Sequence, residues 1–501
     1  MERLHDACGV VGIYTPAAGI GDNIDVRSYL TLALTALQHR GQESAGMAVY
    51  DHTGQIAQRI EMGKVRDVFK DSGASLPPTH CGIGHVRYST TGSSCVENAG
   101  PFVVGRRDEA IALAHNGNLV NSASLQKLLP DDVAVSEEVT DSEIMALLLL
   151  HARGDNFRER VLATLPLLYG AYSLVILTEG KLYAIRDPWG MRPLCLGRIG
   201  AGWAVASESC AFDRLGAQFV RKVEPGEMIT VDDDGLHTEQ VITAPRHALC
   251  VFEYIYFSDA TTLLNGRYTY TVREALGREL ALEHPVESDM VVPVPDSSIP
   301  AALGYAAASG IPYGQAIIKN RYSDRSFIKP DQRLRQLEVD LKFNLVQPKI
   351  QGARLIIVDD SIVRGNTMKR LVSALRNRGV KEIHLRSSSP PLRHPCYFGI
   401  DVPQEEELIA AGRSVQEVAR YIGVDSLGYL SLAGLERAIN SAGQQPVDIP
   451  NDETAEQMLH SEFCYGCMQK TGWPFNPFNE MVMAPEQKKA LFVGRGMARR
   501  G

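Results

Sequence analysis

The 501-residue sequence lacks any run of apolar residues that approaches the ~20 needed for a membrane-spanning helix. Residues 1–7 carry mixed charges and no apolar run, which excludes a secretory signal at this end. The nine cysteines are an odd number scattered along the chain, a pattern typical of thiols or metal ligands in a reducing compartment rather than of a disulfide framework. We therefore expect a cytoplasmic protein with no membrane partner.

Positive charge is also scarce, since the formal net charge is −8. Nucleic-acid binders need dense cationic patches, so this balance argues against a nucleic-acid partner. Phosphorylated small molecules remain open as ligands, because a few cations and backbone amides suffice for them. Neither a Walker lysine motif nor a G-x-G-x-x-G fingerprint is present, which disfavours nucleotide hydrolases and dehydrogenases. The length and the hydrophobic fraction of 45% favour a soluble protein with two large domains.

Residues 8–240 alternate short apolar strands with helical patterns in which apolar residues recur at spacings of three and four. The predicted strands are Ala45–Tyr50, Gly82–Tyr88, Ile111–His115, Ser173–Leu177 and Leu182–Ile185, and the predicted helices are Leu30–His39, Asp141–Leu150 and Arg158–Leu168. This alternation indicates a layered α+β domain.

Beyond residue 260 the pattern changes to strand, helix, strand, which is the signature of a parallel α/β sheet. The charged segment Lys319–Lys349 predicts a lid or an unstructured loop. We place this second domain at 260–440, followed by a C-terminal segment, 441–501, that carries a C-x-x-C and packs back on the core. The predicted strands are Met290–Pro295, Leu355–Val358 and Glu382–Ser387, and the predicted helices are Ile299–Ala308 and Met368–Arg378.

The most informative stretch is the loop after the second of these strands. An apolar strand delivers two adjacent carboxylates, Asp359 and Asp360, to the strand end at which α/β proteins bind ligands. Gly365 allows close approach of the backbone at a helix start, and Thr367 can cap that helix and donate its hydroxyl. These features predict a phosphate cradle beside a site for a sugar hydroxyl or a hard cation. The plainer alternative is a strand end with two solvated aspartates.

The first domain carries a second chemical signature. A single Cys-Gly pair such as that at Cys8 is usually core filler, but here four motifs follow in order. The motifs are Cys8-Gly-Val-Val-Gly-Ile, His39-Arg-Gly-Gln-Glu-Ser-Ala-Gly46, Gly84-His-Val-Arg-Tyr88 and His115-Asn-Gly-Asn-Leu119. Together they resemble the class II glutamine amidotransferases, whose fold is the αββα sandwich of N-terminal-nucleophile (Ntn) hydrolases.

This resemblance implies that Cys8 is the nucleophile and that its own α-amine serves as the base. Residues 1–7 precede Cys8, so we expect them to be a propeptide removed before catalysis. The resemblance assigns Arg87 to the α-carboxylate of glutamine and Asp141 to its α-amino group, and it assigns the Asn116 side chain and the Gly117 amide to an oxyanion hole. From the residues alone, the plainer alternatives are a surface ion pair for Arg87 and a helix cap for Asp141.

The aspartate loop resembles the motif for phosphoribosyl pyrophosphate (PRPP) of type I phosphoribosyltransferases, and its longer form is close to that of the glutamine PRPP amidotransferase family. Pro293–Ser298 resembles the pyrophosphate loop of that family, and Lys319-Asn-Arg-Tyr322 also matches. The resemblance implies Mg²⁺ at Ser297, Asp359 and Asp360. The PRPP-binding residues that it implies are Asp359, Asp360, Ser361, Arg364, Gly365, Asn366 and Thr367.

Four further cysteines match the branch of this family that carries an iron–sulfur cluster. By spacing alone, Cys464-Tyr-Gly-Cys467 is a zinc half-site, a redox pair or chance. With Cys250 and Cys396, the resemblance implies four thiolate ligands of a structural [4Fe–4S] cluster. Zinc or free thiols remain the alternatives.

The sequence departs from the family pattern in the segment that resembles the lid over PRPP. Asp324 stands where relatives usually have glycine, and Asp340 stands at a position that is usually basic. An added negative charge opposes a polyanionic substrate, so these residues bear on lid contacts and affinity.

Taken over the whole chain, the resemblance implies a transferase that makes 5-phosphoribosylamine, pyrophosphate and glutamate from glutamine, PRPP and water. It further implies ammonia passage between the two sites, a homotetramer and inhibition by purine nucleotides. One alternative keeps the glutaminase with a different acceptor domain, as in glucosamine-6-phosphate synthase. Another is a regulator that binds PRPP or purines without catalysis.

Overall fold

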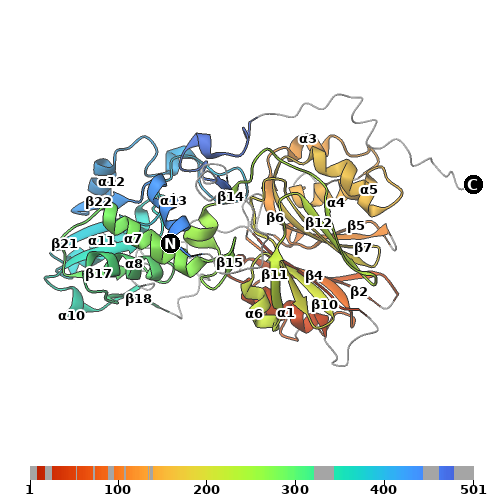
Figure 1. The fold of residues 1–501 in the computed structure, drawn as a ribbon, viewed down its shortest axis with the longest axis horizontal. Coiled ribbons are helices and arrows are strands. Elements are labelled where there is room, and N and C mark those ends of the chain that lie inside the picture. Colours follow the sequence, from red (N-terminus) through yellow and green to blue (C-terminus); the bar gives the residue numbers. More distant parts are fainter. Residues whose placement is uncertain are drawn as a thin grey trace, which may run out of the picture.

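The structure is a computed structural model that describes residues 8–16, 25–51, 53–71, 74–88, 95–106, 109–133, 135, 139–320, 343–443 and 462–478. The chain forms two lobes that lie side by side (Figure 1). The first lobe holds the N-terminal half, and the second holds the chain from about residue 250 onward. Across the described ranges, none of the helices is long and apolar enough to cross a membrane.

The first lobe contains two antiparallel sheets. One has seven strands in the order β11-β9-β10-β1-β4-β2-β3, and the other has six in the order β13-β12-β8-β7-β6-β5. The first sheet consists of β1 (Gly9–Tyr14), β2 (Ser44–Tyr50), β3 (Ile56–Met62), β4 (Cys81–Arg87), β9 (Cys195–Ile199), β10 (Gly202–Ala206) and β11 (Gln218–Lys222). The second consists of β5 (Phe102–Val104), β6 (Ile111–Leu119), β7 (Gly170–Thr178), β8 (Lys181–Arg186), β12 (Glu227–Asp232) and β13 (Gly235–Gln240).

Helices cover the outer face of each sheet, and apolar side chains fill the space between the sheets. Residues such as Val10, Ile83 and Val175 form that inner core. The helices α1 (Val26–Ala36) and α6 (Cys210–Leu215) pack on the first sheet, and α4 (Asp141–His151) and α5 (Phe157–Thr164) pack on the second. The predicted αββα sandwich is therefore confirmed. The remaining short elements of this lobe are α2 (Val65–Val68), η1 (Val96–Asn98), α3 (Ser122–Gln126) and η3 (Leu165–Leu167).

Among the boundaries in this lobe that differ from the prediction, two have a clear physical cause. Helix α1 begins at Val26 instead of Leu30, because the Asp25 side chain accepts a hydrogen bond from the Arg27 backbone and caps the helix there. Strand β6 runs past His115 to Leu119, since its pairing with β7 continues through the polar residues. This extension places the expected oxyanion residues on a strand.

The second lobe is built on a parallel sheet with the order β17-β20-β21-β22, which confirms the predicted α/β domain. Along β20, Leu355 and Ile357 face one apolar core while Ile356 and Val358 face the other, so both faces are buried. The strands are β17 (Met290–Pro293), β20 (Arg354–Asp359), β21 (Glu382–Ser387) and β22 (Ser426–Tyr429). The helices are α7 (Thr269–Glu283), α8 (Ile299–Ser309), α10 (Gln347–Ile350), α11 (Asn366–Asn377), α12 (Val415–Ile422) and α13 (Leu432–Ser441), with a short turn η5 (Glu405–Glu407).

The expected lid segment is only partly described. Its ends form an antiparallel pair, β18 (Ile317–Lys319) with β19 (Phe343–Leu345). Residues 321–342, including Asp324 and Asp340, lie outside the described residues.

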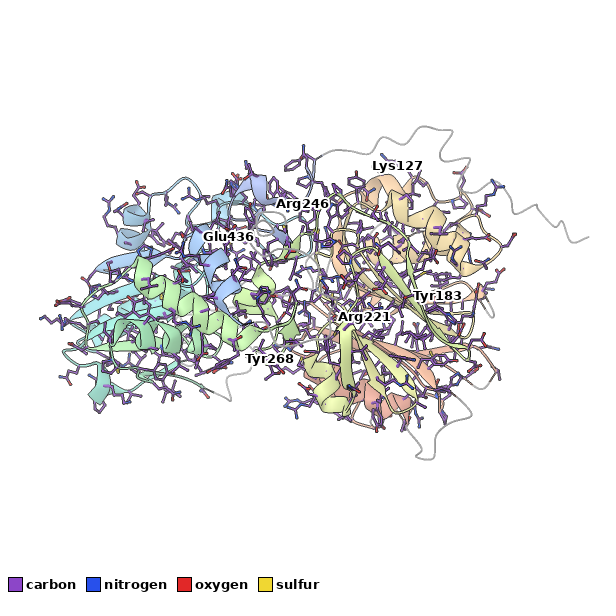
Figure 2. The ribbon with its side chains drawn as sticks, in the orientation of Figure 1. Lys127, Tyr183, Arg221, Arg246, Tyr268 and Glu436 are labelled. Carbon is purple, nitrogen blue, oxygen red and sulfur yellow. The ribbon has the colours of Figure 1, made fainter. Side chains whose placement is uncertain are left out.

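The junction between the lobes is made of short elements. They are β14 (Leu249–Cys250), the π-helical turn η4 (Glu253–Phe257), β15 (Leu263–Leu264), β16 (Arg267–Tyr268), β23 (Phe463–Cys464) and η6 (Lys470–Gly472). Strand β23 of the C-terminal segment pairs in parallel with β14. Arg246, labelled in Figure 2 where the lobes meet, donates to the backbone oxygens of Phe463 (3.3 Å) and Trp473 (2.8 Å). These bonds hold the described part of the C-terminal segment on the junction.

Candidate active sites

Four of the residues predicted for glutamine chemistry line one cavity of about 30 Å³ in the first lobe: Cys8, Arg87, Gly117 and Asp141. They come from separate elements, because Cys8 directly precedes β1, Arg87 ends β4, Gly117 lies in β6 and Asp141 begins α4. The remaining wall residues are His85, Tyr88, Asn98, Phe102, His115, Thr140 and Ser142. The fold thus brings together four residues that are far apart in the sequence.

Cys8 is half-buried, and its thiol lies 3.9 Å from the carbonyl oxygen of Tyr88. Burial raises the pKa of the Cys8 thiol, and the nearby Arg87 guanidinium opposes this only in part. The thiol is therefore protonated at neutral pH, and attack on an amide needs a base. Residues 1–7 lie outside the described residues, so cleavage before Cys8 stays a prediction.

Asn116 is fully buried, and neither the nitrogen nor the oxygen of its side chain has a hydrogen-bond partner among the described residues. Such a buried amide costs stability unless a ligand satisfies it. Its neighbour Gly117 has φ +150°, and a Cβ there would lie 1.9 Å from the carbonyl oxygen of Ala171. Glycine is thus required at 117; Gly117 lines the cavity, whereas Asn116 is not among its lining residues.

The carboxylate of Asp141 is held at the start of α4. Its oxygens accept hydrogen bonds from the backbone of Leu119 (3.0 Å) and of Ser142 (2.8 Å). The cap of this helix is Thr140, whose hydroxyl accepts from the backbone of Glu143, so the alternative of Asp141 as the cap is wrong. The alternative of a surface ion pair for Arg87 is also wrong, because that side chain is buried.

Two histidines sit in the wall of this cavity without pairing with the thiol. His85 Nε2 lies 3.1 Å from the His115 carbonyl, and the ring of His115 contacts Ser142 Oγ (3.0 Å) and the Ala171 carbonyl (3.3 Å). Burial lowers the pKa of His85 to about 3, and it also lowers that of His115. Both rings are neutral at pH 7, and these contacts do not support a Cys–His dyad.

In the second lobe, the parallel sheet brings the two predicted loops together at its carboxyl edge. Ser297 Oγ donates to Asp360, and Ser298 Oγ donates to Asp359 Oδ1 at 3.3 Å. The contact arises because β17, which leads to the serines, pairs with β20, which ends at Asp359. Hydroxyl and carboxylate oxygens of this kind suit Mg²⁺, which takes one or two carboxylates and completes its shell with water and substrate phosphates. The donor set fits that ion.

Gly365 immediately precedes helix α11, at the predicted phosphate cradle. It is the N-cap residue, with φ +76°, and a Cβ there would lie 2.4 Å from Ile409 Cδ1. The prediction that Thr367 caps this helix is wrong, because the helix begins at Asn366, one residue before it. The twelve-residue helix α11 presents its first amides at this point, which favours an anion.

The side chains beside this cradle turn toward neighbouring elements. Arg364 Nε is 2.8 Å from Glu407 Oε2, and Asn366 Oδ1 accepts from the hydroxyl of Tyr421 at 2.8 Å. Ser361 donates to Asp360 Oδ1 at 2.9 Å. These three side chains are thus engaged within the protein, which leaves the backbone amides of the loop as the expected phosphate donors.

Sequence reasoning missed Arg273, which lies on α7 among apolar residues. Its buried guanidinium donates to the carbonyls of Tyr254 and Ser258, both at 2.8 Å. Burial lowers the pKa of Arg273, and the negative charge of Asp360 opposes that shift. Nothing in the local pattern marks this arginine, because its partners lie on other segments.

The four cysteines assigned to a cluster converge from three segments of the chain. Cys250 and Cys464 are register partners in β14 and β23, and the pKa of the Cys467 thiol is raised by burial and then by Cys396, Cys250 and Cys464. All four are free thiols. Across the described ranges, no group of three or more histidine, cysteine or acidic residues is close enough to hold a single ion. Four converging thiols suit the four-cysteine ligation of a [4Fe–4S] cluster, and a four-cysteine zinc site or free thiols remain the alternatives.

Comparisons with known proteins follow the same division of the chain. A family model described as a glutamine amidotransferase domain matches residues 85–214, and one described as a phosphoribosyl transferase domain matches residues 270–388. The amidophosphoribosyltransferase of Archaeoglobus fulgidus is 45% identical over 463 residues, which cover 89% of this chain and 99% of that protein. The amidophosphoribosyltransferase of Methanothermobacter thermautotrophicus is 43% identical over 472 residues, which cover 92% of this chain and 98% of that protein.

Two solved structures match nearly the whole fold. One, described as the allosteric regulatory enzyme of purine biosynthesis, has a TM-score of 0.84 at 38% identity and covers 96% of this chain and 99% of its own. The other is glutamine PRPP amidotransferase from B. subtilis complexed with ADP and GMP, with a TM-score of 0.83 at 38% identity, covering 95% of this chain and 99% of its own.

Proposed function

The chain belongs to the amidophosphoribosyltransferase family, and we propose that it converts glutamine, PRPP and water into 5-phosphoribosylamine, pyrophosphate and glutamate. This is the first committed step of de novo purine synthesis. One observation carries the proposal: the same chain places Cys8 with Arg87 and Asp141 around one cavity, and places Asp359 and Asp360 beside a glycine-opened helix at the edge of a parallel sheet.

In the glutaminase half, the sulfur of Cys8 attacks the amide carbon of glutamine. Its proton passes to the α-amine that removal of residues 1–7 would free, and then to the departing ammonia. The amide of Asn116 and the backbone N–H of Gly117 would stabilise the oxyanion, while Arg87 and Asp141 bind the α-carboxylate and α-amine of the substrate. Water then cleaves the thioester and releases glutamate.

In the transferase half, ammonia attacks the anomeric carbon of PRPP as the bond to pyrophosphate breaks. Asp359 and Asp360 would accept hydrogen bonds from the ribose hydroxyls, and the loop 361–367 would hold the 5-phosphate through its backbone amides. Mg²⁺, held by Ser297 and the two aspartates, would neutralise charge on the leaving pyrophosphate. Ammonia would pass from the first lobe to the second within the protein.

The proposed [4Fe–4S] cluster would be structural. Cys250 lies on the link between the lobes, Cys396 on the loop 394–401, and Cys464 and Cys467 on the C-terminal segment. A cluster bound there would join these segments covalently and supply a fixed point at the junction. No step of the reaction runs through it.

Regulation and assembly are part of the same proposal. The relative from B. subtilis was solved with ADP and GMP. We infer that purine nucleotides inhibit this protein, and that it acts in the cytoplasm as a homotetramer. Light scattering tests the homotetramer, and inhibition assays with these nucleotides test the regulation.

The test of the proposal separates the two half-reactions. Cys8→Ala should abolish synthesis from glutamine and leave synthesis from ammonia, because the acceptor site is in the other lobe. Product is followed as pyrophosphate released from PRPP. If wild-type protein releases no pyrophosphate with either nitrogen source, the transferase assignment is wrong. If Cys8→Ala still uses glutamine, the nucleophile assignment is wrong.

The propeptide is tested separately. We expect the intact mass of the active enzyme to correspond to a chain that begins at Cys8. An active enzyme that retains Met1 would overturn this part of the proposal.

A further inference from the structure

Four charged side chains are buried together between the lobes: Arg40, Arg192, Glu208 and Glu253, each no more than 1% exposed. The guanidinium of Arg40 makes two hydrogen bonds with Glu253, at 2.8 and 3.0 Å, and a further one with Glu208. Arg192 reaches the same Glu253 at 3.3 Å. Two arginines and two glutamates thus form one cluster around Glu253, and the ring of His39 also contacts Glu208 at 2.8 Å.

Two members of this cluster reach the glutaminase site. Arg40 Nε donates to the carbonyl oxygen of Cys8 at 3.3 Å. Arg192 donates through Nη2 to the carbonyl oxygen of Gly399. Gly399 lies against the oxyanion strand, since a Cβ there would be 2.7 Å from the carbonyl carbon of Gly117. The cluster therefore contacts the nucleophile's backbone directly and contacts the oxyanion strand through one residue.

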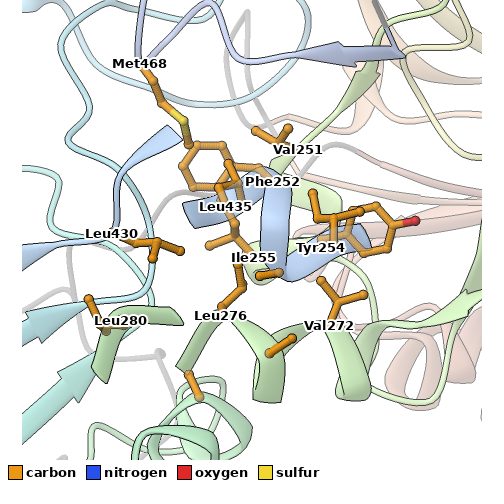
Figure 3. Packing of buried hydrophobic residues seen from close by; sticks show 14 of the residues in the cluster. Val251, Phe252, Tyr254, Ile255, Val272, Leu276, Leu280, Leu430, Leu435 and Met468 are labelled. Carbon is orange, nitrogen blue, oxygen red and sulfur yellow. The ribbon is translucent and has the colours of Figure 1, made fainter. Parts of the chain in front are cut away.

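Glu253 also faces the second lobe. It begins the turn η4, and its Oε2 accepts from Ser258 Oγ at 2.7 Å. The carbonyl oxygen of Ser258 accepts a hydrogen bond from Arg273, and the negative charge of Asp360 acts to raise the pKa of that arginine. Around this path, the apolar residues Val251, Phe252, Tyr254 and Ile255 pack on α7 and α13 (Figure 3). The turn that carries Glu253 is thus fixed to the transferase lobe.

Stability alone does not account for such a cluster. Burying four charges carries a large desolvation cost, and apolar residues of similar size commonly give equal or greater stability. Apolar residues cannot donate hydrogen bonds of defined direction to the carbonyl oxygens of Cys8 and Gly399. The bidentate geometry at Arg40 supplies that direction.

We propose that Glu253 is a positioning residue for the glutaminase reaction: through Arg40 and Arg192 it aligns Cys8 with the oxyanion strand, and it does so from a turn anchored in the transferase lobe. The inference rests on the proposed function and adds to it a residue that touches no substrate. It predicts that glutamine still binds when Glu253 is altered, because Arg87 and Asp141 lie outside the cluster.

The test is Glu253→Gln in the full-length enzyme, assayed with glutamine and separately with ammonia. Glutamine keeps the shape but turns an amide N–H toward the guanidinium groups. We expect kcat with glutamine to fall about 10- to 100-fold, the loss that a small misplacement of reacting groups produces. KM for glutamine and the rate with ammonia should stay within about 2-fold of wild type, as expected for an interaction made only in the transition state.

The control is Arg160→Gln, which breaks another ion pair of the first lobe, that of the buried Arg160 with the exposed Glu179 at 2.7 Å; neither residue lines the cavity. It should lower the thermal midpoint without changing kcat. If Glu253→Gln lowers both activities in parallel with its thermal midpoint, or leaves kcat with glutamine unchanged, the positioning role is overturned.

Arg192→Lys is the second variant, should Glu253→Gln fail to fold. Lysine keeps the positive charge beside Glu253 but has no fork to hold the Gly399 carbonyl as well. We expect the same selective fall in kcat with glutamine, and an unchanged kcat would overturn the role. A wild-type protein that makes no product from ammonia and PRPP would instead refute the proposed function.

Discussion

Replacing Asn116 with leucine is expected to make the protein more stable and the glutaminase reaction much slower. The side-chain amide is fully buried and has no partner among the described residues, so the folded protein pays its desolvation without a compensating bond. An unsatisfied group of this kind costs about 1–3 kcal/mol, and leucine of similar shape removes that cost. The thermal midpoint should rise by about 2–4 °C for each kcal/mol gained in a domain of this size.

The same substitution removes one of the two proposed oxyanion-hole donors. That loss should lower kcat for glutamate release about 10²- to 10³-fold and leave ammonia-dependent synthesis intact. Differential scanning calorimetry gives the stability, and a coupled glutamate assay gives the rate.

Asn121→Leu is the matched control, because Asn121 is also buried but its amide is satisfied by Leu167 (2.8 Å) and Tyr169 (3.1 Å). It should lower the midpoint and keep kcat. If Asn116→Leu destabilises the protein as much as the control does, or leaves glutamate release unchanged, the reasoning is refuted.

Three other outcomes are expected. Burial lowers the pKa of His85 to about 3, whereas the pKa of histidine in the unfolded chain is about 6.5. The free energy of unfolding should therefore decrease as the pH falls from about 6.5 toward 3, by about 1.4 kcal/mol per pH unit. Urea unfolding at pH 7 and pH 5 should show that His85→Gln loses less free energy of unfolding between the two pH values than the wild type does. An equal loss in both proteins would contradict a buried, neutral His85 ring. Asp360→Asn should nearly abolish pyrophosphate release with ammonia, since the loop loses a carboxylate for ribose and Mg²⁺; unchanged release would rule the loop out as the acceptor site. Cys467→Ser should remove the visible absorbance and most of the iron of anaerobically purified protein, whereas Cys81→Ser, a buried cysteine of the first lobe, should keep both. Iron retained by Cys467→Ser would argue against the four-cysteine site.

Much of the fold was predictable because apolar runs and their boundaries are local. Glu382–Ser387 is a strand as predicted, and the helix before it ends within two residues of the predicted Arg378. Strand β22 was missed, since Ser426–Tyr429 is short and contains a glycine. The polar end of β6 was missed because its strand character comes from pairing with β7, not from its own residues.

The candidate sites divide in the same way. Motifs indicated Cys8 and the Asp359–Thr367 loop because their residues are adjacent in sequence. The contact of Arg40 with Glu253 spans 213 positions, and that of Arg192 with Gly399 spans 207. Such contacts depend on how the lobes pack, so they cannot be predicted from a local sequence pattern.

The most direct test of the whole account is to measure glutamate and pyrophosphate in the same reaction, with and without PRPP. If one chain couples the two sites, PRPP should stimulate glutamate release and the two products should form in equal amounts. Glutamate release that is indifferent to PRPP, or pyrophosphate release that is indifferent to any nitrogen source, would contradict the account.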